Sequence, residues 1–165
     1  MNALDTNRIT RVAPYRVWRE EDEYRFETDY GILYAVNFEP ESMLGGIPAY
    51  WFGLANRSLT ASPGDVKIRA TVTCIIEELF RSNPDILLYM CDSANDQQAM
   101  RSRLFMRWFN AYARQQDFYI RTEMVVDEGE ENYIALIVQR SHPQLQTIIT
   151  TFDMVIEQFK ANKPQ

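Results

Sequence analysis

The sequence predicts an α+β fold, with a largely antiparallel sheet of about six or seven strands and three main helices. Three observations predict it. The first third of the chain carries short, alternating apolar segments that are typical of strands. After a connector rich in Ser, Pro and Gly at residues 58–65, the apolar period changes from two to about 3.6. Strand-like and helix-like segments then follow one another, which favours helices layered on a sheet.

The strands before the connector are predicted from alternation and turn residues. Residues 15–20 form a short edge strand, and residues 23–38 form a hairpin whose turn ends at Gly31. Glycine fits the end of such a turn because it adopts a left-handed backbone at no steric cost. Residues 49–57 are a further strand, rich in aromatic side chains.

An amphipathic helix is predicted after the connector. Asp65 lies near its start, where a carboxylate caps free amides and favours the helix dipole. The sequence NPD at residues 83–85 ends it. The apolar face is predicted to carry Ile68, Val72, Ile75, Ile76 and Leu79. The positions predicted to lie away from that face are Lys67, Thr71, Cys74, Glu78 and Arg81.

Strands and a second helix are predicted in the second half of the chain. Residues 86–91 form a continuous apolar run, which is typical of a strand covered on both faces. The second helix is predicted to begin between Ser93 and Asp96 and to run to about Gln115. Residues 118–126 and 132–140 form a hairpin around the acidic turn DEGEE. The unit from Ile86 to Val126 would be a right-handed crossover if its two strands run parallel.

The last helix is predicted to open at Pro143, because proline suits a first helical turn. Its inner side is predicted to carry Leu145, Ile148, Ile149, Phe152, Val155, Ile156 and Phe159. A chain of 165 residues suits one domain. We therefore expect a mobile leader at residues 1–14, a single globular α+β domain at residues 15–160 and a frayed tail at residues 161–165.

Composition narrows the classes of function. The net charge is −6, from 17 basic and 23 acidic side chains, which makes nucleic-acid binding an unfavoured role. Cys74 and Cys91 have no CxxC spacing, so we expect free thiols in a reducing cytoplasm rather than a disulfide or a zinc site. The first residues carry no apolar h-region and no segment approaches 18 consecutive apolar residues, so we expect neither secretion nor a membrane role. We also expect no cofactor.

Asp92, Asp96 and Arg101 form a candidate ligand-binding set where the strand at 86–91 meets the next helix. Sites at the carboxyl end of a covered strand often hold ligands. The favoured interpretation is structural, because an arginine partly covered by aromatic side chains must be paired and either aspartate is near enough in sequence to pair with it. The alternative is a small-ligand or metal-dependent site, since hard cations take oxygen ligands.

A row of polar residues on the second helix is a candidate partner surface: Arg103, Arg107, Asn110 and Arg114. A solvated helix face is the simpler interpretation. No Asp or Glu lies between Arg101 and Arg114, however, so the row has one sign of charge and suits an acidic partner or a second copy of the chain. The acidic DEGEE turn is a candidate counterpart, although such turns are commonly solvated hairpin tips.

The sequence holds no catalytic signature: no Gly-rich phosphate loop, no GxSxG and no HExxH. We therefore favour a non-enzymatic cytoplasmic interaction domain that forms a homo-oligomer or binds another protein. The alternative function is an enzyme or sensor that uses Asp92, Asp96 and Arg101.

Three segments resemble a small family of bacterial proteins that is classed as a domain of unknown function. They are YRFETDYGILYAVNF, ILLYMCDSANDQQAMRSRLFMRWF and NYIALIVQRSHPQ, and together they cover most of residues 23–159. The middle segment is the most specific, with a strand and a row of distinctive positions in one line: Cys91, Asp92, Asp96, Gln98, Arg101, Arg103 and Trp108. The resemblance implies a single compact domain in a bacterial cytoplasm, with no catalytic residues to carry over.

Overall fold

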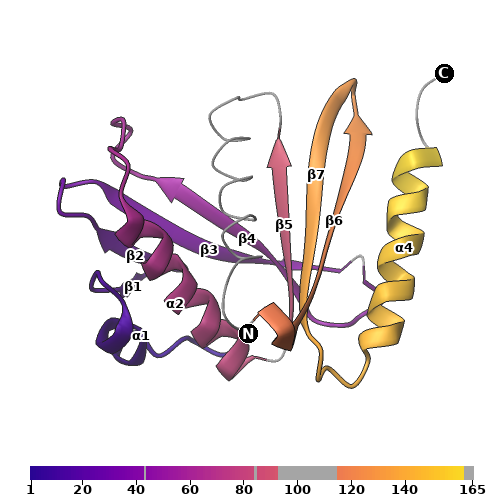
Figure 1. Ribbon diagram of the computed structural model, residues 1–165, viewed down its shortest axis with the longest axis horizontal. Coiled ribbons are helices and arrows are strands. Elements are labelled where there is room, and N and C mark those ends of the chain that lie inside the picture. The colour runs from indigo at the N-terminus through magenta and orange to yellow at the C-terminus, as the bar shows by residue number, and fades with distance from the viewer. Residues whose placement is uncertain (43, 84, 93–114, 162–165) are drawn as a thin grey trace. The chain divides into compact units, whose positions relative to one another are not determined.

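The structure is a computed structural model that describes residues 1–42, 44–83, 85–92 and 115–161 (Figure 1). The described helices are α1 (Thr6–Val12), α2 (Val66–Ser82), α4 (Leu145–Ala161) and the short 3-10 helix η1 (Gln115–Asp117). The strands are β1 (Trp18–Glu20), β2 (Glu23–Glu27), β3 (Leu33–Glu41), β4 (Ala49–Asn56), β5 (Ile86–Asp92), β6 (Phe118–Asp127) and β7 (Glu130–Gln139). They form one seven-stranded sheet in the order β1-β2-β3-β4-β5-β7-β6. The α+β class and the strand number predicted from the sequence are confirmed.

One pair in the sheet is parallel. It joins β4 to β5, which follow one another through α2, with Ala49 opposite Ile86 and Trp51 opposite Leu88. β5 and β6 each pair antiparallel with β7, which lies between them, so these two strands run in the same direction. The condition set for a crossover between Ile86 and Val126 is therefore met. Its connection lies outside the described residues, and its handedness stays a prediction.

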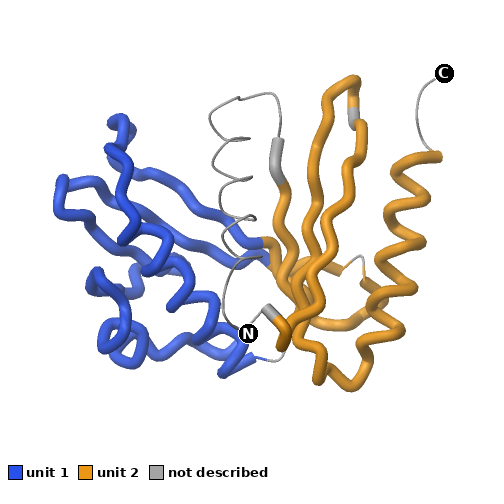
Figure 2. The backbone as a smooth tube through the Cα atoms, viewed as in Figure 1, with its two compact units in different colours: residues 1–39, 52–84 blue, residues 40–51, 85–165 orange. Residues whose placement is uncertain are grey.

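The chain divides into two compact units (Figure 2). Unit 1 comprises residues 1–39 and 52–84, and unit 2 comprises residues 40–51 and 85–165. The single domain expected over residues 15–160 stays a prediction, and each unit is described by itself.

Unit 1 contains a helix, α1, that the sequence did not indicate. Asp5 caps it by accepting a hydrogen bond from the Arg8 amide at 3.1 Å, and Leu4 and Ile9 are buried. The Leu4 amide also donates to the Tyr24 hydroxyl at 2.9 Å. A segment placed outside the domain by the sequence thus carries core residues of unit 1.

The N-terminal segment packs against α2, where it contacts Glu78, and two predictions for this helix were wrong. Thr71 and Glu78, predicted to lie away from the apolar face, are buried. The Glu78 carboxylate accepts a hydrogen bond from Arg81 at 2.9 Å and lies 3.3 Å from Arg8 of α1. These charges, Arg81 first, hold the pKa of Glu78 below its usual range. A helix has a second buried side when another helix covers it, and α2 has one.

Glu78→Gln tests this contact. Removing the charge should lower the free energy of unfolding by about 1–3 kcal/mol at pH 7, because the ion pairs of the buried carboxylate with Arg81 and Arg8 would be lost. The folded-state pKa is depressed, so the stabilisation is present above the unfolded value and disappears as pH falls through the folded value. Urea unfolding at pH 7 and pH 3 should therefore show a smaller difference between variant and parent at the lower pH. The exposed Glu157→Gln is the matched control; equal losses for both would refute the assignment.

Unit 2 is a sheet region with α4 packed on one face. Ile134, Leu136 and Val138 of β7 lie on the face toward α4. The buried cluster consists of Leu44, Ile47, Ala49, Ile86, Leu88, Val125, Ile134, Leu136, Val138, Ile148, Phe152 and Ile156. Leu87, Ala135 and Ile137, on the other face, are also buried. The prediction that residues 86–91 form a strand covered on both faces is confirmed for Ile86, Leu87 and Leu88, but it is wrong for Met90, which is 46% exposed.

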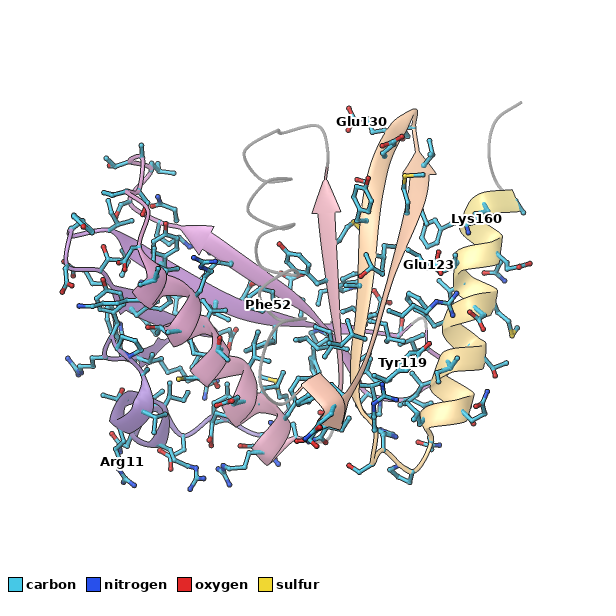
Figure 3. The ribbon with its side chains drawn as sticks, viewed as in Figure 1. Arg11, Phe52, Tyr119, Glu123, Glu130 and Lys160 are labelled. Carbon is cyan, nitrogen blue, oxygen red and sulfur yellow. The ribbon has the colours of Figure 1, made fainter. Side chains whose placement is uncertain are left out.

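The β6–β7 hairpin is longer and its turn is tighter than the sequence predicted. Only Glu128 and Gly129 lie between the strands, and both have positive φ, 48° and 82°. A two-residue turn with this backbone matches the twist of its strands, so pairing continues to Asp127 and Glu130. Glu130 lies at the tip of the hairpin (Figure 3).

The last helix begins at Leu145 rather than Pro143. The Gln144 amide donates to His142 Nδ1 at 3.0 Å, so a turn precedes the helix. The predicted inner side is confirmed, since Ile148, Phe152 and Ile156 are buried.

Candidate interaction surface

The residues that the sequence singled out fall largely outside the described part of the chain. Asp92 is the last residue of β5 and lies opposite Asn132, but its side chain is not among those described. Asp96 and Arg101 also lie outside the described residues. So does the predicted partner surface, formed by Arg103, Arg107, Asn110 and Arg114. The choice between an anchor and a ligand pocket therefore stays a prediction.

A polar cluster in unit 1 surrounds the hydroxyl of Tyr15. That hydroxyl donates to Asp65, the N-cap of α2, and accepts from the Asp29 amide at 3.3 Å. Lys67 lies 2.8 Å from the Asp29 carboxylate and 5.6 Å from the centre of the Tyr15 ring. Burial first, then the Asp65 contact, raises the pKa of Tyr15 to about 12. These contacts join the start of α2 to the β2–β3 turn.

The described residues contain no group of three or more His, Cys, Asp or Glu side chains placed to hold a metal ion. None of their helices is long and apolar enough to cross a bilayer.

The outer edge of β6 is the most distinctive surface of unit 2. β6 is ten residues long and stands last in the sheet, with β7 as its neighbour. Since successive side chains of a strand point to opposite faces, Tyr119, Arg121, Glu123 and Val125 share the face on which α4 packs. The opposite face of the strand carries Phe118, Ile120, Thr122, Met124 and Val126.

Arg121 links β6 to α4. Its Nε donates to the Glu123 carboxylate at 2.9 Å, and Nη1 donates to Asp153 of α4. Its guanidinium also lies over the Phe152 ring, 5.5 Å from the centroid. Lys160, farther along α4, lies 3.7 Å from Glu123. We call these four charged residues, Arg121, Glu123, Asp153 and Lys160, the Arg121 cluster.

The Arg121 cluster lies between β6 and α4, and the labelled Glu123 and Lys160 point toward one another across that space (Figure 3). The hydrogen bond to Glu123, and then that to Asp153, raises the pKa of Arg121 above its ordinary value. Two basic and two acidic groups make the cluster electrically neutral. It fixes α4 on one face of the edge strand and leaves no excess of charge there.

The other face of β6 is apolar and partly open. Met124 is 44% exposed and Thr122 is exposed, while Ile120 and Val126 are partly exposed. An edge strand offers backbone N–H and C=O groups to another strand, and natural proteins commonly protect such edges with charges or bulges. The protection of β6 is one-sided, because its charged residues lie on the α4 face.

The β6 strand was predicted from the sequence, but its contact with α4 through Arg121 was not. The spacing of Arg121 and Glu123, two residues apart in a strand, indicates that they share a face. Asp153 is 32 residues away from Arg121, and only the packing of α4 brings it there.

The region that contains β6 and most of α4 matches a known protein family. A family model described as "Family of unknown function (DUF6169)" matches residues 64–154, which is more than half of the chain. The chain belongs to this family. The match confirms the resemblance inferred from the sequence, although the hairpin segment at residues 24–38 precedes the matched range. All of β6 and Asp153 lie in the DUF6169 region, whereas Lys160 follows it. No curated protein and no solved structure matches the chain.

A double-mutant cycle tests the link between β6 and α4. Arg121→Gln and Asp153→Asn should each destabilise the protein, and the pair should show a coupling free energy of about 0.5–1 kcal/mol because one contact is lost in both. Glu123→Gln with Lys160→Gln is the matched comparison. Its coupling should be close to zero, because the distance is longer and Lys160 is half exposed. Equal couplings in urea unfolding at low protein concentration would contradict this account.

Proposed function

We propose that this protein is a protein-interaction domain that self-associates through the outer edge of β6. One observation carries the proposal: a ten-residue strand ends the sheet, and the face turned away from α4 is apolar and partly exposed. Pairing with another strand satisfies edge N–H and C=O groups and buries apolar side chains together.

Charge supports a protein partner over nucleic acid. The chain carries a net charge of −6, and the Arg121 cluster is neutral, so this surface lacks the basic excess that phosphate binding uses. A neutral, partly apolar edge suits a second polypeptide strand. A bacterial source and a cytoplasmic location, expected from the sequence, stay predictions.

The interface is expected to be weak. Two edge strands bury less surface than the roughly 1,600 Å² of a standard stable interface. We therefore expect a dimer that dissociates in the micromolar range or above, and mass must be measured over a series of concentrations.

Met124→Lys tests the proposal. A charge in the apolar row of an edge strand should weaken self-association by about tenfold or more, because pairing would bury the ammonium group. Met154→Lys is the matched control, since Met154 is also an exposed methionine of unit 2 but lies on α4. Sedimentation equilibrium up to several hundred micromolar should show a concentration-dependent dimer for the parent and for Met154→Lys. A parent that stays monomeric throughout, or equal effects of both lysines, would refute self-association through β6.

A further inference from the structure

The β6 strand is self-complementary in one antiparallel register. We infer that two copies of this chain pair β6 with β6 about a two-fold axis that passes through Thr122. The inference rests on the proposed self-association and adds the register, which decides which residues meet across the interface.

A two-fold axis perpendicular to the sheet determines which residues of the two strands lie opposite one another. It places each residue opposite a residue of the second copy at equal distance from the axis, and directly opposed residues share a face. With the axis at Thr122, this residue meets itself. Residues 118–126 then pair with residues 126–118, so the register uses almost the whole of β6.

Every opposed pair in this register is chemically matched. Arg121 lies opposite Glu123 of the second copy, and Glu123 opposite the second Arg121, so the cross-strand charges alternate in sign. Threonine opposite threonine is a favourable cross-strand pair. The remaining opposed pairs are apolar on both sides: Phe118 with Val126, Tyr119 with Val125, and Ile120 with Met124.

Neighbouring registers lack this match, and an axis at Met124 sets Glu123 opposite Val125. An axis at Arg121 sets arginine against arginine, and an axis at Glu123 sets glutamate against glutamate, and like charges directly opposite destabilise a pair. An axis at Ile120 brings Glu123 opposite Asp117 and shortens the overlap to residues 118–122. In the Thr122 register the next outward pair would be Asp127 with Asp117, both acidic, so the pairing ends where the strand ends.

The surroundings of β6 fit the same register. On the α4 face, two Arg121 clusters would meet, each electrically neutral, so no net charge is buried. On the other face, the exposed Met124 would cover Ile120 of the second copy, and both are at least partly exposed in the single chain. The pairing thus covers the apolar row that the Arg121 cluster leaves open.

Cysteine cross-linking reads the register directly. Thr122→Cys places a thiol beside its own copy across the axis, and mild oxidation by dissolved oxygen with copper(II), or a short thiol-reactive cross-linker, should link the two chains. Met124→Cys is the matched control on the same face of the same strand. Its two thiols would lie four residues apart along the strands, about 14 Å, beyond the reach of a disulfide. The parent protein, which keeps its own cysteines, measures the background.

Four outcomes are distinguishable when the chains are separated on a denaturing gel and the mass in solution is measured in parallel. Cross-linked dimer with Thr122→Cys but not with Met124→Cys supports the register. Cross-linking with Met124→Cys alone overturns it in favour of an axis at Met124. A protein that sediments as a dimer without either cross-link overturns the register and leaves self-association standing. A parent that is monomeric at every concentration overturns both.

Discussion

The contacts of Arg121 with Glu123 and Asp153 determine which face of the edge strand β6 is covered by α4. They hold α4 on one face of β6, next to a core in which Ile148 and Phe152 pack against β7. Because the charged residues of the strand are engaged on that face, its other face keeps an apolar row, and its outer edge has no neighbouring strand among the described residues. An isolated surface ion pair contributes little stability, but a guanidinium held by two carboxylates and an aromatic ring fixes geometry.

The contact between Arg121 and Asp153 is of the same kind as the arginine–aspartate anchor that the sequence predicted for Arg101. There, Arg101 was expected to join a helix to the sheet through Asp92 or Asp96. In the described residues the same kind of contact occurs between Arg121 and Asp153, and it joins α4 to β6. A charged anchor of this kind needs a carboxylate on one element and an arginine on the other, and the sequence does not say which pairs fold together.

Local features were predictable from the sequence because their causes are local. Gly31 has φ of 72° at the end of the β2–β3 turn, and Asp65 caps α2. The apolar stripe along α4 was predicted correctly, since it reflects packing on a single core. The α1 helix was missed because it is short and has one buried residue, Ile9. The burial of Glu78 was missed as a consequence, because Arg8, which contacts its carboxylate, lies in the α1 helix that was not predicted.

Non-local features needed the structure. β4 and β5 pair in parallel because α2 connects them, and no residue in either strand indicates this pairing. The place of β6 at the end of the sheet depends on β7 inserting between β5 and β6. The self-complementary sequence around Thr122 is relevant only because β6 is an edge strand. In the interior of a sheet, both sides of the strand would already be paired.

Hydrogen exchange of the β6 amides tests the central claim most directly. In an antiparallel edge strand, the amides of alternate residues point away from the neighbouring strand and exchange with water unless another strand accepts them. We predict that alternate β6 amides become protected as protein concentration rises through the range of dimer formation, while β7 amides keep their protection. Outward β6 amides that exchange at the same fast rate at every concentration would contradict it.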